Sequence, residues 1–114
     1  MKAKDMAKQY EESGYTKECL TKIMMELREE IFTLMDKRGI VQDSPNLRGA
    51  VAVFDELNQK FNAFARRVNE AKGEPHLKDD GFYMLLRAIA PELCDSVEEM
   101  KQIVRDKEAR MRQR

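Results

Sequence analysis

The sequence predicts an all-α protein, an antiparallel bundle of four or five helices joined by short loops and assembled as a homo-oligomer. Apolar residues recur at alternating steps of three and four residues along most of the chain. Five Gly and three Pro in 114 residues are too few for a turn-rich all-β chain. Most of them stand between the periodic segments, where helices end, and the length favours one helical domain over residues 1–114.

The first expected helix covers residues 2–12. Its narrow apolar stripe consists of Ala3, Met6, Ala7 and Tyr10. Ser13 and Gly14 should end this helix, because Gly adopts the left-handed backbone past a helix C-terminus without strain. A terminal helix this short frays unless it docks on the rest of the fold.

A second helix is expected after Thr16, whose hydroxyl suits an N-cap. Its stripe alternates steps of four and three residues and consists of Leu20, Met24, Leu27, Ile31 and Leu34, widened by Ile23 and Met35. Gly39 is expected just past the helix end, and Ile40 can then fold back onto the last turn.

The third helix, residues 44–72, is predicted to begin with Ser44 as N-cap and Pro45 as its first residue. Its stripe contains three Phe and consists of Leu47, Val51, Phe54, Leu57, Phe61, Phe64 and Val68. Because this is the most hydrophobic element, we expect it to form the centre of the core. Gly73 and Pro75 should close it.

A loop over residues 74–80 leads to a fourth helix, which Asp79 or Asp80 can cap. The inward-facing residues of that helix are expected to be Phe82, Leu85, Leu86 and Ile89. Pro91 interrupts the pattern, and the chain resumes a helix either there or at Ser96, which has capping-box spacing. In both cases the stripe is Leu93, Val97, Met100 and Val104.

Composition and motifs argue against an enzyme and against a bound metal or cofactor. Because the chain has one His, a His-based metal site or a triad would have to be built around His76, and no Ser or Cys with a matching signature accompanies it. No Gly-rich phosphate loop occurs, and the two Cys have neither metal-site nor disulfide-framework spacing. Two Cys without a disulfide framework fit the reducing cytoplasm best, and no apolar run is long enough to span a membrane.

The second helix carries a broad apolar face. Eight Met are many for this length, and Met suits adaptable contact surfaces as well as irregular cores. Two neighbouring Met in this helix cannot share one stripe, so one of them lies off it. We expect another protein or a second copy of the chain to cover this face, whose candidate residues are Met24, Met25, Phe32 and Met35.

The C-terminal residues are basic although the formal net charge of the whole chain is +0. Residues 105–114 are expected to form a frayed, solvated helix end. The candidate basic patch consists of Lys101, Arg105, Lys107, Arg110, Arg112 and Arg114. Such a patch holds phosphates or an acidic partner, or it simply keeps the helix end soluble. The neutral total is unlike that of a dedicated nucleic-acid binder.

Residues 76–91 contain a Gly-Phe pair, then Arg-Ala-Ile-Ala and a nearby Pro, and a Gly-Tyr pair precedes the second helix. This pattern resembles small all-helical phage proteins that sequester the cyclic oligonucleotide signals of the CBASS antiviral system. The resemblance implies a multimeric sponge with pockets between protomers, in which Tyr15 stacks on bases and Arg87 holds phosphates. Arg66, Arg67 and His76 complete the candidate ligand-binding residues.

These observations favour a small binding protein of the phage or mobile-element type, acting in the cytoplasm (of the host, if phage-encoded). It would sequester or block a macromolecular partner, for example as an anti-defence factor or inhibitor. The alternative is a cyclic oligonucleotide sponge with inter-subunit pockets. A third hypothesis is a nucleic-acid accessory protein that uses the basic tail.

Overall fold

The computed structural model describes residues 2–40, 47–78 and 81–112 of the chain. These ranges contain helices and no strand, which confirms the all-α class. The helices are α1 (Ala3–Glu12), α2 (Lys17–Lys37), α3 (Leu47–Lys72), α4 (Phe82–Ile89) and α5 (Pro91–Arg112). The caps predicted for the third and fourth helices lie outside the described residues; they are Ser44, Pro45, Asp79 and Asp80.

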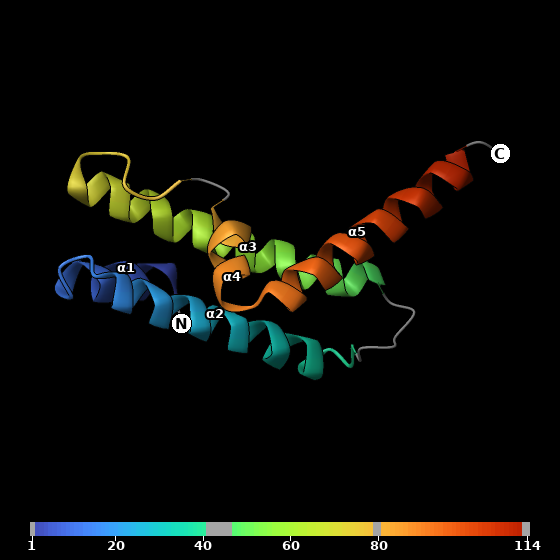
Figure 1. Cartoon of the computed structure of the whole chain (residues 1–114), viewed down its shortest axis with the longest axis horizontal. Coiled ribbons are helices and arrows are strands. Elements are labelled where there is room, and N and C mark those ends of the chain that lie inside the picture. The colour runs from blue at the N-terminus through green and yellow to red at the C-terminus, as the bar shows by residue number, and fades with distance from the viewer. Residues whose placement is uncertain (1, 41–46, 79–80, 113–114) are drawn as a thin grey trace.

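The first three helices run lengthwise beside one another, and α3 contacts each of the other four (Figure 1). The short α4 lies across α2 and α3, and α5 then crosses α3 and projects beyond it (Figure 1). The last two helices therefore depart from the near-parallel packing that the heptad-like stripes favour. The molecule measures 53 × 28 × 21 Å along its principal axes.

Two predicted helix ends are present in the structure. The side chain of Thr16 accepts a hydrogen bond from the backbone N–H of Cys19 at 3.3 Å, as an N-cap does. Gly39 has a φ of +69°, and the N–H of Ile40 donates to the carbonyl of Met35 at 2.8 Å. This 6→1 bond and the burial of Ile40 are the features of a Schellman motif.

The core is centred on α3, as its sequence predicts. The three Phe of its stripe, Phe54, Phe61 and Phe64, are fully buried. Met6 and Tyr10 of α1, the α2 stripe and Phe82 and Leu86 of α4 pack around them. No polar or charged residue is buried in the described part of the chain. Burial of apolar surface is therefore the main force that holds the helices together.

Pro91 separates two helices. Ala90 has non-helical dihedral angles of −148° and 66°, because Pro disfavours the helical conformation in the residue before it. Pro91 is the first residue of α5, where its missing N–H costs nothing. The alternative start at Ser96 is wrong: this residue lies inside α5, and its hydroxyl donates to the carbonyl of Glu92 at 3.0 Å.

Candidate functional site

An aromatic cluster lies at the end of α1. Gly14 and Tyr15 both have positive φ values, +77° and +59°, and Tyr15 is the only described non-Gly residue in this left-handed region. Its N–H donates to the carbonyl of Tyr10 at 2.9 Å. This turn brings the ring of Tyr15 edge-on to the ring of Tyr10, with centroids 5.3 Å apart. The hydrogen bond and the ring contact with Tyr10 thus hold Tyr15 in this strained conformation.

The loop after α3 completes this cluster. The side-chain amide of Asn69 accepts from the N–H groups of His76 and Leu77 at 2.8 and 2.7 Å and donates to the carbonyl of Leu77 at 2.6 Å. The imidazole Nε2 of His76 then lies 2.8 Å from the hydroxyl of Tyr10. Burial raises the pKa of Tyr10, so its phenol stays protonated and can donate this hydrogen bond.

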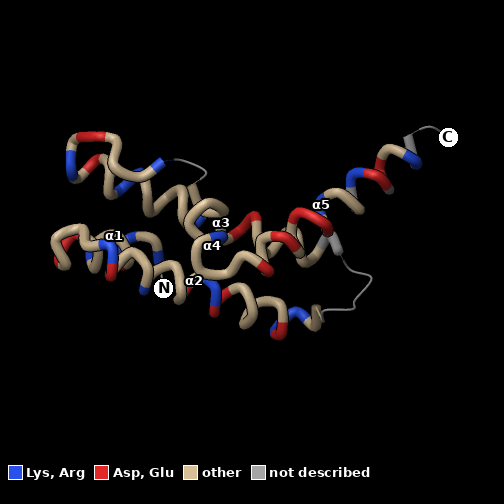
Figure 2. Tube along the Cα trace, viewed as in Figure 1, with Lys and Arg blue, Asp and Glu red and all other residues tan. Residues whose placement is uncertain are grey.

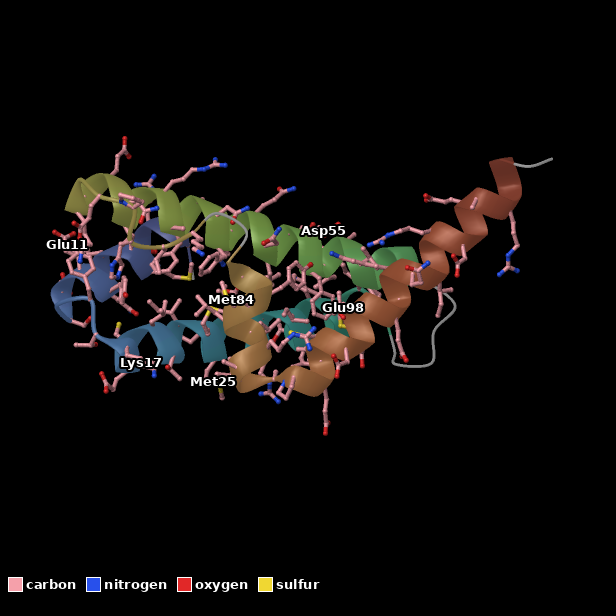
Figure 3. The ribbon with its side chains drawn as sticks, turned by 45° about the horizontal axis from the view of Figure 1, so that its top comes forward. Glu11, Lys17, Met25, Asp55, Met84 and Glu98 are labelled. Atoms are coloured by element: carbon pink, nitrogen blue, oxygen red, sulfur yellow. The ribbon has the colours of Figure 1, made fainter. Side chains whose placement is uncertain are left out.

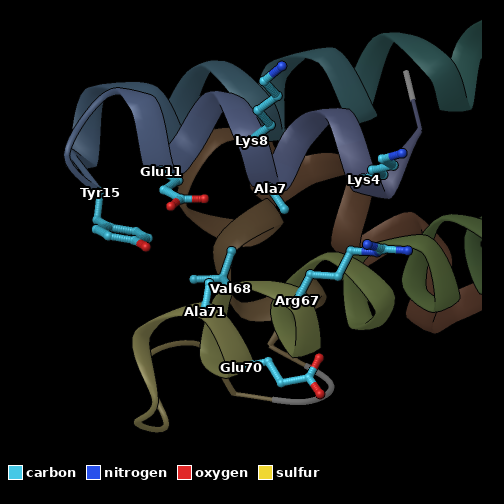
Figure 4. A pocket seen from close by; sticks show the side chains of 9 residues that line it. All are labelled: Lys4, Ala7, Lys8, Glu11, Tyr15, Arg67, Val68, Glu70 and Ala71. Carbon is cyan, nitrogen blue, oxygen red and sulfur yellow. The ribbon is translucent and has the colours of Figure 1, made fainter.

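Tyr15 also lines a groove of about 430 Å³ between α1 and α3. Figure 4 shows the lining residues, which are Lys4, Ala7, Lys8, Glu11, Tyr15, Arg67, Val68, Glu70 and Ala71. The ammonium of Lys72 lies 4.3 Å from the centroid of the Tyr15 ring. The groove thus combines an aromatic ring with three cationic and two acidic side chains, and its size suits a small ligand.

A second candidate site is the apolar surface that α2 and α4 expose. Met25, Phe32 and Met84 have exposed fractions of 42%, 43% and 62%, and we call them the α2–α4 face. Figure 3 shows Met25 and Met84 on these two helices, which contact each other. The exposed apolar side chains on these two contacting helices make the α2–α4 face a candidate contact surface.

Phe32 belongs to a pocket of about 430 Å³ beside the junction of α4 and α5. The pocket is lined by Arg28, Phe32, Ile89, Ala90, Pro91, Glu92, Leu93 and Ser96. The guanidinium of Arg28 lies 5.2 Å from the centroid of the Phe32 ring, within the range of a cation–π contact. Five of the eight lining residues are apolar, so the pocket suits an apolar side chain of a partner.

Three Glu, one Lys and one Thr stand around Met25 at the rim of the α2–α4 face, and Arg28 pairs with Glu29 at 3.1 Å. A shallow depression of about 440 Å³ around Met25 is lined by Lys22, Met25, Glu26, Glu29, Glu30 and Thr33. Burial alone would raise the pKa of Glu30. The hydrogen bond and the positive charge of Lys60, together with other facing positive charge, outweigh this effect, so the pKa of Glu30 is lowered. The ammonium of Lys60 lies 2.8 and 2.9 Å from the two carboxylate oxygens.

Replacing Lys60 with Met is expected to destabilise the protein by roughly 1 kcal/mol at neutral pH. A lowered carboxyl pKa adds stability above the ordinary value of 4.5, and this stability is lost as the pH falls through the folded-state pKa. The difference in the free energy of unfolding between the wild type and Lys60→Met should therefore become smaller below the folded-state pKa of Glu30. Urea unfolding between pH 3 and 7 measures it, and a loss independent of pH would contradict this role of Lys60.

The structure brings together three of the five predicted ligand-binding residues. Tyr15 and Arg67 line one groove, and the rings of Tyr15 and His76 are 5.8 Å apart. Arg66 is exposed on α3 and does not line the groove. Arg87 lies on α4, where its guanidinium is 2.9 Å from Asp95 and 2.7 Å from Glu98. These two carboxylates raise the pKa of Arg87 and compete with any phosphate.

The predicted interface residues divide between the core and the surface. Met24 is 2% exposed and belongs to the core, so its assignment to a partner surface is wrong. Met35 is half-buried against the core, whereas Met25 and Phe32 are exposed. Met84 was missed, although the stripe of Phe82, Leu86 and Ile89 places residue 84 on the opposite side of α4.

The predicted basic tail is also divided. The ammonium of Lys101 lies 3.0 Å from the hydroxyl of Tyr83 and 3.6 Å from a carboxylate oxygen of Asp55, so it fastens α5 to the fold. Arg105 and Arg110 are exposed. The other three members have side chains outside the described part: Lys107, Arg112 and Arg114. Of the described members, Lys101 therefore belongs to the contacts within the fold, and Arg105 and Arg110 remain candidates for a basic surface.

The described residues contain neither a membrane-spanning helix nor a cluster of metal ligands. No helix in the described ranges is both long and apolar enough to cross a membrane. Among the same residues, no three His, Cys, Asp or Glu side chains converge as ligands of a metal ion would. Comparison of the chain with protein-family models, with curated proteins and with solved structures gave no match.

Proposed function

We propose that the chain is a non-enzymatic, cytoplasmic homo-oligomer that sequesters or blocks another protein through the α2–α4 face. The observation that carries the proposal is the exposure of three large apolar side chains on two adjacent helices. Exposure of this kind is unfavourable unless a partner covers it. An inhibitor or anti-defence factor, of the type that phages and mobile elements encode, needs only such a surface.

The chemistry of the face defines the partner. The flexible Met25 and Met84 adapt to irregular apolar surfaces, and the pocket beside Phe32 accepts an apolar side chain. Glu26 stands at the rim beside Glu29, which Arg28 already pairs at 3.1 Å, so Glu26 favours a basic residue at this edge of the apolar contact. The expected partner surface is therefore apolar at its centre, with a basic residue at the edge that meets Glu26, and high salt should weaken that one ion contact.

Photo-cross-linking from position 84 in extract of the native host tests this proposal. A benzophenone amino acid in place of Met84 should give a cross-link that excess wild-type protein prevents. Excess Met25→Ser/Phe32→Ser variant should not prevent it, because that variant lacks the face. A benzophenone at Glu11, far from α4 in Figure 3, is the control. Equal competition by wild type and variant would overturn the proposal.

A second candidate function is a sponge for a cyclic oligonucleotide, with the α1–α3 groove as its site. Two of the five predicted ligand-binding residues, Tyr15 and Arg67, line this groove, and His76 lies against Tyr15. The groove offers Tyr15 for stacking and Lys4, Lys8 and Arg67 for phosphates. Cyclic dinucleotides should then raise the melting temperature of the wild type but not of Arg67→Ala. Arg66→Ala is the matched control, since Arg66 does not line the groove. If no cyclic dinucleotide raises the melting temperature of the wild type, the sponge function is excluded.

A further inference from the structure

The outer part of α5 projects from the rest of the molecule. Lys101 is bound to α3 and α4 through Asp55 and Tyr83, and beyond it the helix leads away from the other helices (Figures 1 and 3). The exposed residues of this part include Gln102, Ile103, Arg105, Asp106, Ala109 and Arg110. An isolated helix of this length is marginal in water, so a projecting helix gains stability when it packs on something.

The charges of α5 are segregated along its length. Residues 91–100 contain four acidic residues and no basic one, whereas residues 101–112 contain five basic and two acidic residues. Figure 2 shows Asp and Glu along the first half and more Lys and Arg along the second. A helix with opposite charges on its two halves is complementary to an antiparallel copy of itself.

One side of α5 combines this charge order with an exposed apolar residue at its middle. Ile103 is 47% exposed, and Glu99 precedes it by one helical turn on the same side. Residue 107, a Lys, and Arg110 follow at steps of four and seven. In the described part of the chain Glu99 and Arg110 have no ion-pair partner, whereas Asp95 and Glu98 are held by Arg87.

We propose that two copies of the chain associate through α5 in antiparallel orientation about a two-fold axis at Ile103. Each Ile103 then packs on its counterpart, and Glu99 of each copy faces positions 107 and 110 of the other. The interface is isologous, so both ion contacts form twice. The proposal specifies the homo-oligomer part of the proposed function and rests on it. Each dimer would carry two α2–α4 faces and would bind a multivalent partner with avidity.

A single helix pair with one apolar residue at its centre buries little surface, so the dimer should be weak and sensitive to salt. Charge reversal tests it by sedimentation velocity. Glu99→Lys alone, and Lys107→Glu/Arg110→Glu alone, should each weaken self-association by about tenfold or more, because like charges then face each other. An equimolar mixture of the two variants should regain the dimer, since opposite charges then face each other at both contacts.

Arg105→Glu is the matched control, because residue 105 lies on another side of α5 and its reversal should leave the dimer intact. A melting temperature for every variant checks that the fold is kept. Wild type that stays monomeric would overturn both this interface and the homo-oligomer. A wild-type dimer that both variants retain, or a mixture that stays monomeric, would overturn this interface alone. None of these outcomes changes the result expected from the cross-linking test of the α2–α4 face.

Discussion

Replacing Phe61 with Ala is expected to lower the free energy of unfolding by about 3–5 kcal/mol. Phe61 is fully buried in α3, and its ring lies 5.7 Å from that of Phe64 and 6.0 Å from that of Phe82. The variant therefore loses the ring contacts of Phe61 with Phe64 and Phe82 and leaves a cavity between α3 and α4. Denaturant unfolding monitored by far-UV circular dichroism measures the loss.

Phe32→Ala is the matched control, since it removes the same group from a side chain that is 43% exposed. Its expected cost is about 1 kcal/mol or less, because little buried surface is lost. If Phe32→Ala cost as much as Phe61→Ala, Phe32 would belong to the core and could not serve the α2–α4 face.

Replacing Asn69 with Ala should have the second-largest effect, about 2 kcal/mol. The substitution removes the amide that makes three hydrogen bonds to the backbone of His76 and Leu77. Without them the loop separates from α3, and the contact between His76 and Tyr10 is lost. Hydrogen exchange at the N–H of Leu77 should become faster in the variant.

Asn69→Asp separates the two halves of this interaction. The carboxylate keeps the acceptor for both N–H groups and strengthens these two bonds by its charge, but its second oxygen replaces the donor and repels the carbonyl of Leu77. The free energy of unfolding of Asn69→Asp should therefore lie between that of the wild type and that of Asn69→Ala. An unchanged exchange rate at Leu77 in Asn69→Ala would show that other contacts hold this loop.

The helical stripes and the turn residues contained most of the information on local structure. Thr16, Gly39 and Pro91 act through their own backbone chemistry, so the ends that they set could be read without tertiary contacts. The direction of α4 and α5 could not be read in this way. It depends on the dihedral angles of Ala90 and on how the short α4 fits across two helices.

The candidate sites were harder to predict because they join distant parts of the chain. Tyr10 and His76 are 66 residues apart in sequence, and only the fold brings them within hydrogen-bond distance. The pairing of Arg87 with Asp95 and Glu98 depends on the turn at Pro91. Periodicity, in contrast, does separate Met24 from Met25, since the stripe of α2 contains only the first of them.

The central claim is that the α2–α4 face, and not the groove at the end of α1, binds the partner protein. The most direct measurement is the affinity of the cross-linked partner, once purified, for three forms of the chain. Phe32→Ser/Met84→Ser should weaken binding at least tenfold relative to wild type, while Tyr15→Ala/Arg67→Ala should bind like wild type. The account is contradicted if the groove variant loses affinity and the face variant keeps it.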